Sequence, residues 1–443
     1  MEKNVIYKEL IAEVSNKLSE KIINEEDNLI KKATVIDMDI KDIVQEIGLQ
    51  TTLKVLENTR DKIVLKKKAE GMTIHKNPTI RFNIIFGTIE IKSPYLWPGE
   101  IPSKPLTDEM NITPQGRSQT VKRALSEFGI DDSFSKASKK FKEHYNFEIG
   151  ISAVDRTTKE IAQEASVYID NKLSAVNKKT DIEDCPFIDK MLIEMDGCEI
   201  RTALMKEIEN SDTQTPVYGN PSKKKIVKWR DVRLGFARPL DDPEKLFVGK
   251  MDCYPKVVNQ LHSAAELIGM TSETEVIGIA DGGIGLSEEL KRQFPNMQFI
   301  LDKSHLRDHF YDTAEKMGIP KDERSKWAEP QINKISNGEV AQIRGELLSE
   351  NDRSPCDRLK RLIGYLDRFE DAMNYNRFKE KNYPIGSGEI ESAHKSVPQK
   401  RLKIPGATWH PDSIDPMLAL RILRADDWWE DFWELRTKEC LAA

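Results

Sequence analysis

The feature that most constrains the fold is a stretch between residues 187 and 305, where apolar segments typical of strands alternate with amphipathic segments typical of helices. The predicted segments are, in order, strands at 187–197, 200–205 and 223–239, a helix at 257–270, a strand at 275–283, a helix near 287–294 and a strand at 297–305. Three strands followed by helix, strand, helix and strand predict an α/β domain with a mixed sheet.

The flanking sequence changes pattern several times. Apolar residues at three- and four-residue spacing predict helices near the start, and TIRFNIIFGTIEIKSPYLW predicts a β-hairpin turning near Gly87. The chain therefore divides into an N-terminal helical region (1–75), a β-hairpin (76–103), a second helical region (104–182), the first part of the α/β core (183–305), a helical insertion (306–380) and the C-terminal helices of the core (381–443).

Within residues 104–182, two predicted helices flank a short turn at 146–151. This arrangement fits either a helix-turn-helix that enters the DNA major groove or a plain helical hairpin packed in a bundle. The turn alone favours the hairpin, whereas the cations of the two helices favour DNA, because phosphate contacts need positive charge. These cations are Lys136, Lys139, Lys140, Lys142, Arg156 and Lys159.

Composition excludes several classes of protein. The 443 residues carry 68 Lys+Arg against 74 Asp+Glu, a net charge of −6. No apolar run is long enough to span a membrane, and the first residues lack the apolar core of a signal peptide. The five cysteines are scattered without a CxxC pair, which fits a reducing cytoplasm and argues against a zinc ribbon. No GxxxxGK[ST] loop is present, so no nucleotide cofactor is expected.

Two aspartates share a position at the end of a predicted strand. Asp196 and Asp281 each follow an apolar segment, and each precedes a glycine. A lone aspartate at such a place is usually a turn former or a helix cap. Two of them in one α/β domain, at the carboxyl ends of strands that can be neighbours, also fit a metal site at the edge of the sheet.

A third acidic element follows in PIGSGEIESAHK, where Ser387 is the expected N-cap of a helix. Glu389 and Glu391 lie in its first turns, where either can complement the helix dipole or act as a third acidic ligand. The spacing does not choose between these roles. Three carboxylates suit Mg²⁺ or Mn²⁺, and two such ions about 4 Å apart catalyse phosphodiester displacement.

Several motifs in this order resemble bacterial insertion-sequence transposases of the DDE type, closest to the ISKra group of the mutator-like superfamily. They are Asp196-Gly197, ADGGIG, LDKSHLRDH, GSGEIES and the run from QKRLK to WWEDFW, together spanning roughly residues 75–435. The resemblance implies an RNase H-like mixed-sheet core with a helical insertion, preceded by a mainly helical DNA-binding region. The most specific parts are GSGxxES and the C-terminal run.

The resemblance also implies roles for individual residues. Asp196 and Asp281 match the first two catalytic carboxylates and metal ligands, and Glu391 matches the third, with Glu389 as the reserve candidate. Asp302 and His305 match an accessory DxxH motif. Two departures stand out: GIG replaces a Trp-containing stretch after the second Asp, which puts substrate contacts there in doubt, and the stretch YLWPGEIP lacks the Cys knuckle of relatives.

The implied function is a DNA transposase that uses Mg²⁺ or Mn²⁺ to cleave strands and transfer them. Its partner is double-stranded DNA, both terminal inverted repeats and target, and it is expected to act as a homo-oligomer in the bacterial cytoplasm, associated with the nucleoid. Two alternatives stay open. One is an inactive or domesticated descendant that binds DNA without cutting it, and the other is an RNase H-like structure-specific nuclease.

The negative net charge hides basic segments that fit DNA. Residues 211–238 hold seven Lys/Arg against two Asp, while seven acids between Asp412 and Glu434 make the sum negative. Trp229 or Trp409 can stack on an unpaired base. The predicted DNA contacts are Lys136, Lys139, Lys140, Arg156, Lys225, Lys228, Arg230, Lys395, Lys400 and Arg401.

Overall fold

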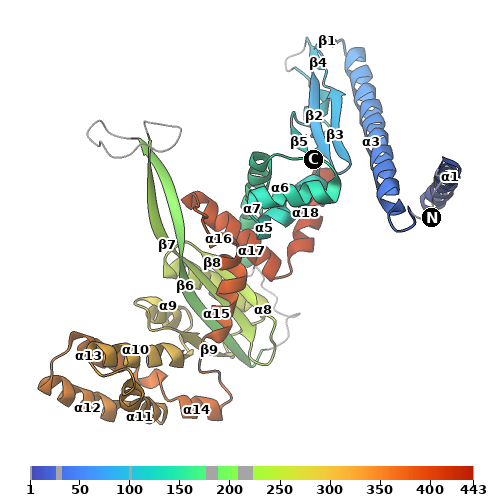
Figure 1. Ribbon diagram of the computed structural model, residues 1–443. Coiled ribbons are helices and arrows are strands. Elements are labelled where there is room, and N and C mark those ends of the chain that lie inside the picture. Colours follow the sequence, from blue (N-terminus) through green and yellow to red (C-terminus); the bar gives the residue numbers. More distant parts are fainter. Residues whose placement is uncertain (1, 26–31, 99–101, 176–187, 208–222, 443) are drawn as a thin grey trace. The chain divides into compact units, whose positions relative to one another are not determined.

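The protein has a mixed α/β fold, seen in a computed structural model (Figure 1). The structure describes residues 2–25, 32–98, 102–175, 188–207 and 223–442. The chain forms two compact units, Met1–Ala124 with Lys139–Ile149 and Leu125–Ser138 with Gly150–Ala443. Among the described residues, no helix combines the length and the apolar character needed to cross a bilayer.

The first unit is built from helices and small sheets. Its elements are α1 (Glu2–Glu25), α3 (Ile36–Ala69), β1 (Thr73–Lys76), β2 (Thr79–Ile84), β3 (Gly87–Lys92), β4 (Tyr95–Trp97), α4 (Pro105–Asp108) and β5 (Gly116–Arg117). Strands β1 and β4 form a pair, and β2 lies between β3 and β5 in a second sheet.

The predicted hairpin is confirmed as the antiparallel pair β2–β3. Alternate residues of both strands are buried, because one face packs against α3 through Leu49, Leu53 and Leu56. Gly87 begins β3 at a φ of 144°, a conformation that side chains other than glycine rarely adopt. The hairpin therefore turns where the sequence places its glycine.

Three helices lie between this hairpin and the main sheet along the chain. They are α5 (Gln119–Asp131), α6 (Phe134–Tyr145) and α7 (Ile151–Ala175). Residues of the predicted region 104–182 belong to both units, and 176–182 lie outside the described residues. The turn between α6 and α7 falls at the predicted place, whereas the helix-turn-helix role and the predicted domain boundaries stay predictions.

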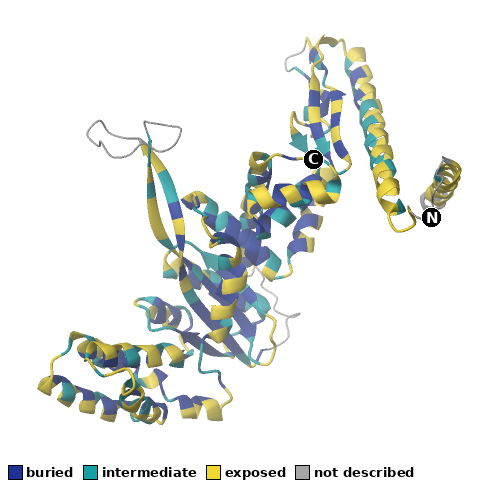
Figure 2. Cartoon of the chain, viewed as in Figure 1, coloured by how far each residue is buried: buried dark blue, intermediate teal, exposed yellow. Residues whose placement is uncertain are grey.

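The second unit contains a five-stranded mixed sheet. Its strands are β6 (Lys190–Glu207), β7 (Lys223–Pro239), β8 (Leu246–Lys250), β9 (Glu275–Ala280) and β10 (Gln298–Leu301), in the spatial order β10-β9-β6-β7-β8. Strands β6, β7 and β8 are antiparallel neighbours, whereas β9 is parallel to both β6 and β10. The apolar centres of these strands form the buried core of the unit (Figure 2).

The prediction of separate strands at 187–197 and 200–205 is wrong. Strand β6 is a single strand that continues through Asp196 and Gly197, because each of its residues from Met191 onward pairs in unbroken register with β7. The sequence interpretation treated Asp-Gly as a turn, but an uninterrupted partner strand overrides that local preference. The short strand β8 was not predicted.

Helices cover the sheet and complete the unit. These are α8 (Tyr254–Ile268), α9 (Leu286–Gln293), α15 (Gly388–His394), a π-helical turn (Lys395–Gln399), α16 (Lys400–Leu402), α17 (Ile414–Ala425) and α18 (Trp429–Ala442). Helix α8 packs on β7 and β8, while α17 packs between β8 and α7.

The chain between β10 and α15 is a helical insertion. It consists of α10 (Lys303–Lys316), α11 (Arg324–Ser336), α12 (Val340–Arg353), α13 (Asp357–Arg368), a 3₁₀ turn (Glu370–Ala372) and α14 (Tyr375–Glu380). Its two ends meet, since the backbone N–H of Lys303 donates to the carbonyl of Ile385 at 3.1 Å. The insertion therefore leaves the sheet and returns to it at one place.

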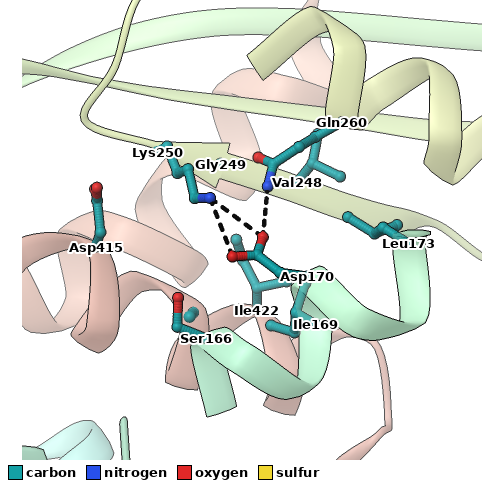
Figure 3. Close-up of a pocket in the computed structure, with 11 residues that line it drawn as sticks. Ser166, Ile169, Asp170, Leu173, Val248, Gly249, Lys250, Gln260, Asp415 and Ile422 are labelled. Carbon is teal, nitrogen blue, oxygen red and sulfur yellow. Dashed lines mark hydrogen bonds and ion pairs between the residues drawn. The ribbon is translucent and has the colours of Figure 1, made fainter. Parts of the chain in front are cut away.

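A polar cluster joins α7 to the sheet and to α8 (Figure 3). The carboxylate of Asp170 accepts hydrogen bonds from Lys250 Nζ at 3.1 and 3.3 Å and from Gln260 Nε2 at 2.9 Å. Beside it lies a cavity of about 10 Å³, which has room for about one water molecule. Asp170 thus bonds α7 to both β8 and α8.

We expect Asp170→Ala to lower the free energy of unfolding by about 1–3 kcal/mol, because Lys250 and Gln260 lose their common acceptor. Asp352→Ala, at an exposed position on α12, is the control and should change it by less than about 0.5 kcal/mol. Urea unfolding followed by tryptophan fluorescence measures both. Equal effects would contradict the role of the cluster.

Candidate active site

Two aspartates lie at the same level of adjacent parallel strands. Glu194 of β6 pairs with Ile279 of β9, and Asp196 and Asp281 each follow that pair by two residues. Asp196 remains inside β6, whereas Asp281 follows directly on the last residue of β9. The parallel pairing therefore brings together the two acids that the sequence singled out.

Each aspartate has one anchored oxygen and one open oxygen. Oδ1 of Asp196 accepts the N–H of Gly197 at 2.7 Å, and Oδ1 of Asp281 accepts the N–H of Gly283 at 3.0 Å. Burial raises the pKa of Asp196, and the charge of Asp281 raises it further, while His394 and the Gly197 N–H oppose this. A bound cation offsets the repulsion between two such carboxylates.

The turn that follows Asp281 is held by the helical insertion. A Cβ atom added at Gly282 would lie 2.1 Å from a ring carbon of Tyr365 on α13. The guanidinium of Arg368, at the end of the same helix, donates to the carbonyl of Gly282 at 2.5 Å. Glycine at this position thus allows α13 to pack directly against the loop that carries Asp281.

Two buried acids anchor the start of α15. Asp302 accepts the backbone N–H of Ser387 at 3.0 Å and also its hydroxyl. Glu194 accepts the N–H of Ile390 at 2.8 Å. Ser387 occupies the predicted N-cap position, but its hydroxyl donates to Asp302 instead of capping the helix. The helix is therefore fixed to both β6 and the start of the insertion.

The two candidate glutamates of α15 have different surroundings. Glu389 forms ion pairs with Arg238 at 2.6 Å and with Lys245 at 2.7 Å. Although burial opposes it, these two cations lower the pKa of Glu389. Glu391 is exposed, and among the described residues its carboxylate has no hydrogen bond or ion pair. The geometry therefore favours Glu391 over Glu389 as an open acidic ligand.

Glu391 belongs to a cluster of donor groups with Asp302 and His305, whose ligand atoms all lie within 4.8 Å of one another. Asp302 is fully buried and accepts hydrogen bonds from two first-turn N–H groups of α10 as well as from the start of α15. It is therefore better placed as an anchor than as a ligand. The charge of His305 is a minor influence that lowers the pKa of Asp196, and neither Asp196 nor Asp281 belongs to this cluster.

The chemistry of these groups fits a hard divalent cation. Asp302, His305 and Glu391 are, among the described residues, the group whose ligand atoms converge, and Asp196 and Asp281 carry two further carboxylates, on β6 and directly after β9. Mg²⁺ and Mn²⁺ favour such oxygen donors and retain several waters.

Sequence reasoning left two residues of this region unassigned. Glu194 was detectable as a lone charge inside the apolar run MLIEM. His394 follows Glu391 by three residues and so lies on the same side of α15. Glu194 lies two residues before Asp196 in the predicted strand 187–197, so alternation already puts both on one face. His394 could not be connected to Asp196 without the position of β6.

Beyond the sheet, β6 and β7 continue as a two-stranded basic ribbon, defined as residues 198–207 and 223–232 (Figures 1 and 2). One face forms a groove of about 280 Å³ that is lined by Thr202, Leu204, Lys206, Ile226, Lys228 and Arg230. The other face carries Lys225 and exposes Met205, Val227 and Trp229. Among the described residues, no carboxylate pairs with Lys206, Lys225 or Lys228.

The remaining predicted DNA contacts lie in varied surroundings. Lys136 pairs with Asp132 at 2.9 Å, and Lys400 pairs with Asp131 at 3.1 Å. The other four are Lys139, Arg156 and Lys395, which are exposed, and Lys140, which is half-buried.

Arg401 is a correction to the predicted DNA contacts. Its side chain is buried between the rings of Phe134 and Trp409, with 4.6 Å from the guanidinium carbon to each ring centre. It also donates to the carbonyl of Gly129 at 2.8 Å. Arg401 therefore stabilises the interior and does not reach a phosphate. Trp409, itself buried, is likewise not available for stacking on a base.

Neither a protein-family model nor a curated protein sequence matches the chain. Among solved structures, it is weakly similar to the Drosophila P element transposase strand transfer complex, at 11% sequence identity and a TM-score of 0.34. The match covers 72% of this chain and 94% of the other. A score this low does not establish a shared fold.

The protonation of Glu194 should make stability depend on pH. Burial raises its pKa to about 8 from an ordinary value of 4.5, with the Ile390 N–H opposing the change. The folded protein therefore holds a proton that the unfolded chain has released. This contribution is complete below the unfolded pKa and is lost as pH rises through about 8, at up to about 1.4 kcal/mol per pH unit in between.

Glu194→Gln should remove that slope. Urea unfolding in EDTA at pH 6 and pH 8 measures the free energy of unfolding of both proteins. The exposed Glu273→Gln serves as control and should keep the wild-type slope. An unchanged slope in Glu194→Gln would show that this carboxyl group titrates normally.

Proposed function

We propose that the chain is a DNA transposase of the DDE type, from a bacterial insertion sequence of the ISKra group in the mutator-like superfamily. Asp196, Asp281 and Glu391 hold Mg²⁺ or Mn²⁺, and the protein binds terminal inverted repeats and target DNA as a homo-oligomer. The observation that carries the proposal is the placement of Asp196 and Asp281 at one level, each two residues past the last pair between β6 and β9, beside an anchored helix with an open glutamate.

The topology supports an RNase H-like core for this activity. Three antiparallel strands are followed by two parallel ones, and helices α8 and α9 form the crossovers between β8, β9 and β10. Asp196 lies on the central strand β6, and Asp281 directly follows its parallel neighbour β9. Ligand sites in mixed and parallel sheets form at the carboxyl ends of such strands.

Residues of this chain hold the catalytic carboxylates in place. Asp196, Asp281 and Glu391 would hold divalent cations, which would supply activation of the attacking oxygen and stabilisation of the leaving oxygen in an in-line phosphodiester displacement. Asp302 and Glu194 hold α15 so that Glu391 stays open beside the aspartate pair. Tyr365 and Arg368 hold the loop of Asp281. No side-chain nucleophile is required, so no covalent protein–DNA intermediate forms.

Two displacements make up the proposed reaction. In the first, a water oxygen bonds to phosphorus, the bond to the 3′ oxygen breaks, and a 3′-hydroxyl and a 5′-phosphate result. In the second, that 3′-hydroxyl attacks a phosphodiester of the target, displaces a target 3′-hydroxyl and joins the two DNAs. Because both steps are in-line displacements at phosphorus, one site serves both.

DNA is proposed to contact the basic ribbon and the helical region 104–182. A two-stranded ribbon has dimensions that enter the major groove of DNA. The ribbon cations Lys206, Lys225 and Lys228 can neutralise phosphates without first breaking an ion pair to a described residue. On the opposite face from the groove, Trp229 is 59% exposed and can stack on an unpaired base.

Glu391→Gln should abolish Mg²⁺-dependent cleavage of duplexes taken from the DNA that flanks the coding sequence, and Asp281→Asn should do the same. Glu389→Gln is the matched control, because its carboxylate is engaged by Arg238 and Lys245, and we expect it to keep cleavage within about tenfold. Gel analysis of end-labelled DNA measures all three. If Glu391→Gln still cleaved DNA and Glu389→Gln did not, Glu389 would be the third acidic ligand and Glu391 would not.

The same assay with a pre-cleaved 3′-hydroxyl end separates a transposase from a nuclease. A transposase joins that end to a second duplex, whereas a nuclease does not. An inactive descendant binds the DNA but shows neither reaction.

Replacing Lys206, Lys228 and Arg230 together by Gln should weaken DNA binding and lower the slope of log affinity against log salt by about 2–3, since each phosphate contact contributes about 0.9. A matched triple change of exposed lysines on the insertion, Lys321, Lys326 and Lys360, should leave the slope unchanged. Fluorescence anisotropy between low and moderate salt measures both variants. If the ribbon variant and the control variant had equal slopes, the basic ribbon would not be part of the DNA-binding surface.

A further inference from the structure

His394 is a buried histidine without a hydrogen-bond partner. The residue is 2% exposed, and neither ring nitrogen has such a partner among the described residues. A buried polar atom left unsatisfied costs about 1–3 kcal/mol. Natural structures keep such groups mainly where a function or an unseen ligand compensates that cost.

The imidazole faces the open oxygen of Asp196. Its Nε2 lies 3.7 Å from Oδ2, whereas Oδ1 is taken by the N–H of Gly197. The separation is too long for a hydrogen bond. Two ligand atoms of one small cation lie no more than about 4.2 Å apart, and the observed distance is within that limit.

The helix that carries His394 also carries Glu391. The two residues are three apart on α15, so their side chains project from the same side of that helix. The start of α15 is fixed by Asp302 and Glu194, which prevents it from moving away from β6.

We propose that His394 Nε2 is a nitrogen ligand of the divalent cation bound by Asp196. The inference rests on the proposed metal site and adds a nitrogen donor to its carboxylates. A site with an imidazole donor binds Mn²⁺ more tightly than Mg²⁺, because imidazole is a softer ligand than carboxylate or water. One side of α15 thereby carries both the nitrogen donor, which sets the metal preference, and the open carboxylate of Glu391.

Electron spin echo spectroscopy of bound Mn²⁺ tests the proposal without any DNA reaction. A directly bound imidazole gives a ¹⁴N modulation that ¹⁵N-histidine labelling replaces. Because His305 adjoins the site, the decisive protein is His305→Gln, which keeps His394 intact. We expect the ¹⁴N modulation to persist in it and to disappear in His394→Gln.

Calorimetric titration with Mn²⁺ and with Mg²⁺ gives a second readout. His394→Gln should lower Mn²⁺ affinity by about tenfold or more and Mg²⁺ affinity by less. His262→Gln, a half-buried histidine on α8, is the control and should bind both ions as the wild type does. Circular dichroism checks that each variant is folded.

The outcomes distinguish failure of this inference from failure of the proposed function. Mn²⁺ binding by His305→Gln without ¹⁴N modulation would overturn the role of His394 and leave the carboxylate site intact. This result does not depend on whether His394→Gln folds. If the wild type bound no more Mn²⁺ than Asp281→Asn does, the metal site itself would be overturned.

Discussion

The parallel pairing of β6 with β9 is the constraint on which the candidate site depends. It sets Asp196 and Asp281 at one level, although one lies inside a long strand and the other just beyond a short one. A shift of this register by one residue would turn one side chain to the opposite face of the sheet. The apolar residues around Glu194 and Ile279, buried on both faces, oppose such a shift.

Buried acids give the site its rigidity. Asp302 and Glu194 place carboxyl groups where water cannot reach, which costs free energy. Although burial opposes it, the hydrogen bonds from α15 and α10 lower the pKa of Asp302, whereas burial outweighs the one bond to Glu194 and raises its pKa. In return, the first turn of α15 has a single position relative to the sheet. Glu389 strengthens this by pairing with Arg238 of β7. Three acids thus orient the helix, and a fourth, Glu391, remains open.

Local pattern predicted much of this arrangement, and long-range pairing supplied the rest. The hairpin at Gly87, strand β9 and the helices of the insertion follow from periodicity and turn residues, which are local properties. The continuity of β6 through Asp196 and the burial of Arg401 depend on residues far along the chain, so no window of sequence contains them. His394 was missed for the same reason, because the residue that its ring faces, Asp196, lies almost 200 residues earlier in the chain (394 − 196 = 198).

The helical insertion begins and ends at one point, where Lys303 meets Ile385 and Asp302 meets Ser387. Those bonds close the chain independently of what lies between them. Closing a longer loop costs only about 0.6 kcal/mol for each doubling of its length. Helices α11, α12 and α14 bury apolar residues in the same core as α10 and α13, so the insertion can be replaced as one packed unit but not helix by helix, and α13 must still support Gly282. The insertion is in this sense an exchangeable module with one fixed face.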